Sequence, residues 1–276
     1  MVRWVHVVSS GTSVLCNFER LRSDVASSLG VSGWCRADSE DPVQGVALCR
    51  ARPGDPVFDA LLDFVGGDPE VASAELNAFL KYVGLSSHAP PPEVGVLIYS
   101  SDTGTGYLCA SVIQEYLRRR GYALLTPNPI RIPGLGRSEE AFDDALSNLL
   151  DLVVRKIIDW SRKGVPVYIN ATGGYKAETQ FLVLAAAVAG AKAAYYIHET
   201  FRDVIELPLP PLRIDERLEK LVRVIKAEGE LNPRRYEEIC SQLGVDPQEL
   251  MRDRKIITQD YRPRKWLLRL VTGHEG

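Results

Sequence analysis

The alternation of short apolar runs with longer helical patterns constrains the fold of this chain most. Runs with strand character lie at residues 4–10, 94–101, 122–127, 165–170, 192–197 and 203–209. Helical patterns occupy residues 15–29, 55–83 with a break near Gly66-Gly67, 104–120, 138–163 and 175–189. Strands that are apolar along their length are buried on both faces, which is typical of a parallel sheet with helices on either side. We therefore expect an α/β fold with a Rossmann-like, mostly parallel sheet, and an antiparallel last strand because only a short loop precedes it.

A proline-rich stretch, "LPLPPLR" at 207–213, separates this pattern from the rest of the chain. Residues 1–210 are predicted to form the Rossmann-like domain, and residues 213–276 a second, smaller one. The second part has helical patterns at 215–229, 232–244 and 246–253, followed by "KIITQDYRPRKWLLRLV" with hairpin potential. Short helices followed by a hairpin favour a winged helix-turn-helix-like domain.

Charge and cysteine usage narrow the function classes. A net charge of −3 over 276 residues argues against a protein that coats nucleic acid. Residues 252–269 nevertheless hold seven basic and two acidic side chains, a patch that either meets phosphate or is a solvated face. The five cysteines form no C-x-x-C pair and the four histidines are scattered, so we expect a reduced, cytoplasmic protein without a metal site. The longest apolar stretch is interrupted at Gly190 and Lys192, which excludes a membrane span.

Small, hydroxyl-rich loops follow three of the predicted strands. Ligands of parallel α/β sheets bind outside the carboxyl ends of the strands, and a glycine-rich turn at a helix N-terminus favours an anion. The candidate binding residues are Ser10, Gly11, Thr12 and Ser13 in the first loop, Ser101, Asp102, Thr103, Gly104 and Thr105 in the second, and Thr172, Gly173, Gly174 and Lys176 in the third. We expect the three loops to share one ligand pocket.

Common nucleotide-binding motifs are missing from these loops. No G-x-G-x-x-G follows the first strand, and no G-x-x-x-x-G-K-[ST] occurs, which excludes a standard dinucleotide site and a P-loop NTPase. The predicted pocket contains a central lysine, Lys176, and no metal cluster. Its chemistry is therefore expected to need neither metal nor cofactor.

Three of the loop sequences resemble the CARF superfamily, the CRISPR-associated Rossmann-like domains that bind cyclic oligoadenylates. They are "GTS" (11–13), "SSDTGTG" (100–106) and "NATGGYKAE" (170–178), of which N-x-TGG-x-K is the most specific. The resemblance covers about residues 1–210. A CARF domain with a small winged-helix tail is similar to the archaeal ring nucleases, which implies a homodimer that binds cyclic tetra-adenylate across its two-fold axis and cuts the ring.

The resemblance also implies roles for the site residues. Lys176 would stabilise charge in the transition state, while Ser13, with Thr12 or Ser10, would orient the ribose or donate to a phosphate oxygen. The 2′-hydroxyl of the ring is the nucleophile, so the products carry a 2′,3′-cyclic phosphate. We expect slow turnover because no strong general base is evident. The plainer alternatives are that Lys176 is a solvated helix residue and that Ser13 caps a helix.

Two other functions fit parts of the sequence. A CARF regulator would sense the ring and bind DNA through the winged helix, but the 246–253 helix is short and acidic at its start, which favours cleavage. Arg269 and His274 match the R-x-x-x-x-H spacing of HEPN ribonucleases. Residues 213–276 are too few for a HEPN helical bundle, so we regard this match as chance.

Overall fold

A mostly parallel sheet forms the centre of the molecule. The structure, a computed structural model, describes residues 1–137, 141–174, 176–198 and 203–272. Its seven-stranded sheet has the order β3-β2-β1-β5-β6-β7, with β4 also paired to β2. The strands are β1 (Trp4–Ser10), β2 (Val94–Ser100), β3 (Ala123–Leu124), β4 (Ile130–Arg131), β5 (Val167–Asn170), β6 (Ala193–Ile197) and β7 (Val204–Pro208). Only the β6–β7 pair is antiparallel among the described strands, which confirms the expected mixed α/β fold and its edge hairpin.

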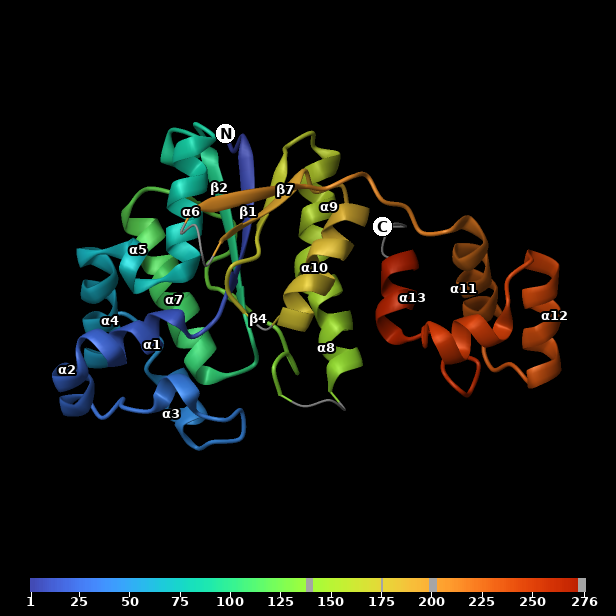
Figure 1. The fold of residues 1–276 in the computed structure, drawn as a ribbon, viewed down its shortest axis with the longest axis horizontal. Coiled ribbons are helices and arrows are strands. Elements are labelled where there is room, and N and C mark those ends of the chain that lie inside the picture. The colour runs from blue at the N-terminus through green and yellow to red at the C-terminus, as the bar shows by residue number, and fades with distance from the viewer. Residues whose placement is uncertain (138–140, 175, 199–202, 273–276) are drawn as a thin grey trace.

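Helices cover both faces of this sheet (Figure 1). One face carries α1 (Ser13–Leu21), α2 (Ser23–Ser28), α3 (Val43–Cys49), α4 (Pro56–Gly67), α5 (Pro69–Ala72), α6 (Ala74–Leu85) and α7 (Gly104–Arg119). The other carries α8 (Phe142–Leu149), α9 (Arg155–Arg162) and α10 (Lys176–Val188), with a π-helical turn at Leu150–Val154 joining α8 to α9. The apolar strands are therefore buried between two separate cores, as their sequence predicts.

The helical pattern at 55–83, which is predicted to break near Gly66-Gly67, forms three helices separated at Asp68 and Ser73. Asp68 and Ser73 each adopt an extended backbone and accept a hydrogen bond from a backbone N–H of the next helix, as N-caps do. Pro69 follows the first of these caps at a position that favours a helix start. This break places the N-terminus of α6 beside the carboxyl end of the sheet. Helix α3 has no counterpart in the predicted elements.

The C-terminal part is helical and has its own apolar core. It contains α11 (Glu216–Glu228), α12 (Pro233–Leu243), a π-helical turn at Glu249–Asp253 and α13 (Lys265–Thr272). The hairpin expected after the third helix is limited to one antiparallel bridge between Ile257 and Pro263. The wing prediction is wrong for residues 265–272, which form α13 instead. Their apolar side chains recur with the spacing of a helix.

Helix α13 packs against α8, and this contact connects the C-terminal helices to the α/β core (Figure 1). Trp266 contacts Phe181 of α10 edge to face, while Leu267 joins a cluster with α11. Five of the seven basic residues in 252–269 form ion pairs within the chain: Arg254 with Glu249, Arg262 with Glu230, Arg264 with Asp143, Lys265 with Asp144 and Arg269 with Asp151. The chain itself therefore neutralises most of the basic patch.

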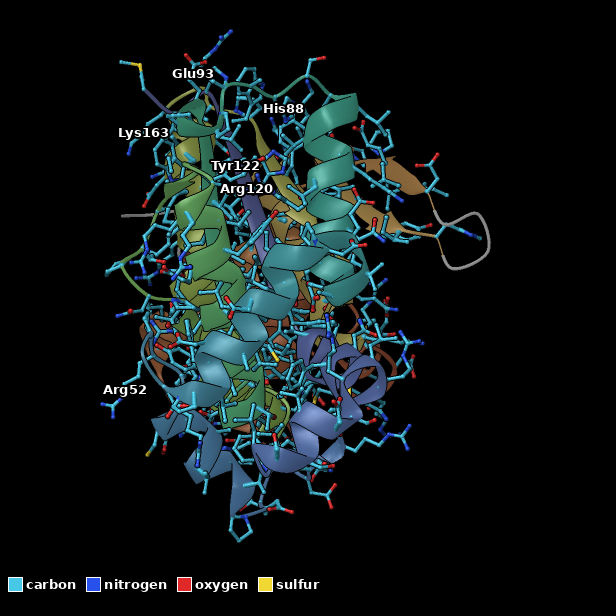
Figure 2. All side chains as sticks on the ribbon, turned by 90° about the vertical axis from the view of Figure 1, so that its left-hand side faces the viewer. Arg52, His88, Glu93, Arg120, Tyr122 and Lys163 are labelled. Carbon is cyan, nitrogen blue, oxygen red and sulfur yellow. A yellow bond between two sulfur atoms is a disulfide. The ribbon has the colours of Figure 1, made fainter. Side chains whose placement is uncertain are left out.

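A buried aromatic cluster lies under α6, away from the loops that follow the strands. His6 is fully buried, where its ring stacks on Tyr168 and its nitrogens lie 3.0 Å from the Tyr195 hydroxyl and 3.1 Å from His88. Figure 2 shows His88 at the end of the molecule opposite the blue helices α1 and α2. Burial, together with the nearby His88, lowers the pKa of His6 well below its ordinary value of 6.5. Burial also lowers the pKa of His88.

We expect this histidine pair to make the fold acid-sensitive. Below pH 6.5 the histidines bind protons in the unfolded chain but remain neutral in the folded protein. The free energy of unfolding is therefore at its full value above pH 6.5 and decreases as the pH falls below 6.5. The slope is at most about 1.4 kcal/mol per pH unit for each histidine. Urea unfolding of the wild type and of His6→Phe between pH 5 and 7.5 measures it. His6→Phe should be less stable than the wild type at pH 7.5, but its free energy of unfolding should depend less steeply on pH. Equal slopes in the two proteins would show that His6 is not the cause of the acid sensitivity.

Candidate functional site

The carboxyl ends of β1, β2 and β5 meet at one edge of the sheet. These are the three central strands, with Ser10 in register with Ser100 and Val8 in register with Asn170. The chain runs outward from β1 to β2 and β3, then returns to the other side of β1 as β5, so strand order reverses here. A cavity of about 640 Å³ opens between the loops that follow these strands. Ligands of doubly wound sheets bind at such a reversal point.

The structure brings the three predicted loops together around this cavity. Its lining includes Ser10, Gly11, Thr12 and Ser13 from the first loop, Ser101, Thr103 and Thr105 from the second, and Thr172, Gly173 and Gly174 from the third. Several of these hydroxyls already have protein partners: Ser101 lies 2.7 Å from the Thr103 hydroxyl, and Thr105 donates to Gln44 of α3. The hydroxyls are therefore held in fixed orientations before any ligand arrives.

Two residues predicted to bind substrate lie elsewhere. The Asp102 carboxylate accepts from the Gly134 N–H and pairs with Arg131 and Arg137, so it anchors the 131–137 loop. Gly104 starts α7 against α3, where an added Cβ would lie 1.8 Å from the Gln44 carbonyl oxygen. The loop pattern assigned both residues to the ligand, but their contacts show that they pack neighbouring segments together.

Lys176 lies on the far side of the third loop. It is exposed at the start of α10 and lines a second, more apolar cavity of about 780 Å³, together with Tyr196, His198 and Leu207. Thr172, Gly173, Gly174 and Thr179 line both cavities. The third loop is therefore a thin partition, with the hydroxyl-rich cavity on one side and the lysine on the other.

Glu75 is a pocket residue that the sequence did not reveal. It lies in the first turn of α6, fully buried, and lines the first cavity. Its carboxylate accepts hydrogen bonds from the Gly11 N–H at 2.8 Å, from the Ser73 hydroxyl at 2.8 Å and, at short range, from the Ser13 hydroxyl. The only signal in the sequence is a Glu two residues after a serine cap, which is an ordinary feature of helix starts.

The glycines of the third loop permit this close arrangement. An added Cβ at Gly173 would lie 2.3 Å from a carboxylate oxygen of Glu75. Gly174 has a φ of +89°, and its Cβ would lie 2.3 Å from the Ser9 hydroxyl oxygen. Both positions therefore require glycine, which lets the loop after β5 approach the first loop and α6.

The Tyr99 hydroxyl lines the first cavity and makes no well-formed hydrogen bond among the described residues, although the hydroxyls of Ser9 and Thr179 lie near it. Burial raises its pKa, so the phenol keeps its proton. Buried hydroxyls are almost always satisfied, and an unsatisfied one in a cavity wall is explained by a bound polar group or water.

The segment 35–39 forms the outer wall of the first cavity. Arg36 lies on this wall, and Arg137 adds a second cation from the loop after β4. A disulfide between Cys16 and Cys35 ties the wall to α1, while Cys49, Cys109 and Cys240 are free thiols. The expectation of wholly reduced cysteines is therefore wrong for this pair, which the spacing of 19 residues did not suggest.

Metal clusters and membrane helices are both missing from the described ranges. No group of three or more His, Cys, Asp or Glu side chains there is arranged to hold a metal ion. None of the helices within those ranges has the length and apolar character needed to cross a bilayer. His274, the histidine of the HEPN-like spacing, lies outside the described residues.

Fold and site together define an α/β protein that has a mostly parallel sheet and a polar pocket where strand order reverses. A protein-family model described as "CRISPR-associated protein (Cas_APE2256)" matches residues 70–210. This chain belongs to that CRISPR-associated family. The matched span contains α6 with Glu75, the second and third loops, and Lys176, whereas the first loop lies before it.

Proposed function

We propose that the protein is a metal-independent ring nuclease that binds cyclic tetra-adenylate and cuts it to linear products, thereby ending type III CRISPR signalling in the cytoplasm. The observation that carries the proposal is the closure of three hydroxyl- and glycine-rich loops around one cavity, with Lys176 just beyond the third loop. Membership of a CRISPR-associated family supports it. The resemblance of the loops to CARF domains supplies the ligand class.

The cavity has the groups that such a reaction needs. Cleavage of RNA by its own 2′-hydroxyl requires that this oxygen be held in line with the leaving 5′-oxygen and that charge on the phosphorus centre be stabilised. Fixed hydroxyls such as those of Ser101 and Thr103 position the ribose and phosphate, and the Tyr99 hydroxyl is available as a donor. Lys176, exposed at the start of α10, supplies the positive charge.

A ring with repeated units suits a site formed by two copies of this chain. In an isologous dimer, each copy presents the same residues to opposite halves of the ligand. The ring would cross the partition at Thr172–Gly174, so that it reaches the hydroxyl-rich cavity and Lys176 at once. Homodimerisation is thus part of the proposal, and the exposed apolar side chains near the second cavity, Leu184, Tyr196 and Leu207, suit such a contact.

The regulator alternative has less support. Its DNA-binding surface would draw on the basic patch at 252–269, but most of that patch is paired with acidic groups of the chain. The expected wing is replaced by α13 beyond Pro263. DNA binding by the C-terminal domain is therefore not favoured, and we assign the domain to contacts within the protein.

Incubation with cyclic tetra-adenylate in EDTA tests the proposed activity. We expect the ring to disappear and linear products ending in a 2′,3′-cyclic phosphate to form, as separated by chromatography and identified by mass. A ring that binds but stays intact would favour the sensor. A ring that does not bind would refute the ligand assignment itself.

A further inference from the structure

We infer that Glu75 accepts the proton in ring cleavage and does so through Ser13, which relays the proton from the 2′-hydroxyl of the substrate. This inference rests on the proposed ring cleavage. It supplies the general base that the sequence lacked. It also gives α6, which lies between β1 and β2 along the chain, a part in the reaction.

The direction of the hydrogen bonds carries the inference. A carboxylate only accepts, so the short contact between Ser13 and Glu75 is a bond from the serine hydroxyl to the carboxylate. The same serine oxygen accepts from the Ala74 N–H at 3.3 Å. Its one proton is thereby committed to Glu75, and its remaining lone pair is available to a hydroxyl in the cavity that Ser13 lines. Ser13 is therefore prepared to accept a proton from a ligand hydroxyl.

The carboxylate is held rigidly for this task. One oxygen accepts from the Gly11 N–H, while the other accepts from the hydroxyls of Ser13 and Ser73. The backbone carbonyl of Glu75 accepts from the Asn170 amide at the end of β5. Gly173 leaves the space that any side chain would take from the carboxylate. Glu75 is thus fixed to both the first and the third loop.

Other charged groups around the cavity lack this link to Ser13. Arg36, Asp38, Arg137 and Glu178 also line it. Asp38 lies on the exposed outer wall, and Glu178 lies in the first turn of α10. Among the described lining residues, Glu75 is the carboxylate that touches a serine of the first loop. The guanidinium groups of the two arginines only donate hydrogen bonds, so neither can take the place of a carboxylate base.

The proposed step balances in protons and bonds. The 2′-hydroxyl proton passes to the Ser13 oxygen as the Ser13 proton passes to Glu75. The 2′-oxygen bonds to phosphorus, the bond from phosphorus to the 5′-oxygen breaks, and that oxygen takes a proton from water. When the product leaves, Glu75 returns its proton to solvent through Ser13. The products are the 2′,3′-cyclic phosphate and a free 5′-hydroxyl.

A purely structural role for Glu75 predicts different results, and a pH profile distinguishes the two. We propose single-turnover cleavage of cyclic tetra-adenylate between pH 4.5 and 8.5 with the wild type, Ser13→Ala, Glu75→Gln and the double variant. The wild-type rate should rise up to tenfold per pH unit to a plateau. Glu75→Gln should lower the plateau by roughly 10² to 10⁴ and remove the acid limb, because general-base catalysis contributes about that factor. The double variant should be no slower than the worse single one, since the residues act as a unit.

Matched variants separate the relay from a general loss of negative charge or of packing in the pocket. Glu178→Gln removes a different carboxylate of the same cavity and should keep the acid limb. Ser73→Ala removes another donor to Glu75 without breaking the relay and should also keep it. Glu75→Asp restores a carboxylate and should recover the limb at a lower plateau. Ring affinity and thermal unfolding of every variant show whether the pocket is still intact.

The outcomes separate this inference from the proposed function. If the wild type binds the ring but yields no product at any pH, ring cleavage fails and the relay fails with it. If the wild type cleaves and Glu75→Gln keeps the acid limb, only the relay is overturned. Multiplying effects of Ser13→Ala and Glu75→Gln would likewise overturn it. Should Glu75→Gln not fold, the pH profiles of Glu75→Asp and Ser13→Ala decide. The relay requires that Glu75→Asp cleave more slowly than the wild type with a rate that still rises with pH. It also requires that the rate of Ser13→Ala not rise with pH.

Discussion

Lys176→Ala is expected to lower the rate of ring cleavage by roughly 10² to 10³, because removal of one group that stabilises transition-state charge costs about that much. The ammonium group lies at the start of α10, where the helix dipole adds to its positive potential. Charge on the phosphate increases as the 2′-oxygen attacks, so the lysine contributes more to the transition state than to the bound ring. Ring affinity should fall much less than the rate.

Single-turnover cleavage and equilibrium binding of cyclic tetra-adenylate, measured in parallel, test this prediction. Lys163→Ala is the control, since Lys163 is an exposed lysine at the end of the molecule away from the blue helices α1 and α2 (Figure 2). Lys176→Arg keeps the charge and should retain part of the rate. A Lys176→Ala protein that cleaves at the wild-type rate would remove the lysine from the mechanism and leave the hydroxyl-rich cavity as the whole site.

The partition between the two cavities explains why the lysine and the hydroxyls are assigned to one reaction. Gly173 and Gly174 form this partition with little side-chain bulk, so a ligand that crosses it meets both walls at short range. A ligand confined to the first cavity would meet Arg36 and Arg137 rather than Lys176. Loss of rate in Lys176→Ala therefore also reports that the ring extends across the third loop.

The sequence predicted those features that follow from the order of strands. Ser10, Ser100 and Asn170 end adjacent parallel strands, so their loops had to meet at one edge of the sheet. It did not predict Glu75, because its contacts with Gly11 and Ser13 join residues more than 60 positions apart. Neighbouring residues in a sequence say nothing about such a contact.

Asp102 and residues 265–272 show how contacts between distant segments add to what a local pattern indicates. An aspartate after a strand suggests a ligand contact, but Arg131 and Arg137 arrive from the next loop and occupy its carboxylate. Residues 265–272 looked compatible with a strand, but they form a helix that packs Trp266 and Leu267 into apolar clusters. In both cases tertiary contacts outweighed the local signal.

Loss of the Cys16–Cys35 disulfide is expected to lower the free energy of unfolding by about 3 kcal/mol. The two cysteines are 19 residues apart, and without the bond the loop between them gains conformational entropy in the unfolded chain. For a chain of this size, this loss of stability corresponds to a decrease in Tm of about 6 to 12 °C. Thermal unfolding of the wild type with and without a reducing agent, beside the Cys16→Ser/Cys35→Ser variant, measures it. Cys49→Ser is the control, since Cys49 is an exposed free thiol. If the double variant has the same Tm as the oxidised wild type, the disulfide adds no stability.

The same bond affects the pocket less than it affects stability. Cys35 lines the first cavity, so the bridge fixes part of the wall. That wall has a second attachment, because the Glu19 carboxylate accepts from the N–H groups of Gly33 and Cys35 at 2.9 and 2.7 Å. After reduction the wall is still held by Glu19. The free energy of ring binding should therefore change by less than the free energy of unfolding does. The variant Glu19→Gln combined with the broken bridge removes both attachments, and ring binding should weaken clearly only in that combination. If breaking the disulfide alone abolishes binding, the wall depends on the bridge and not on Glu19.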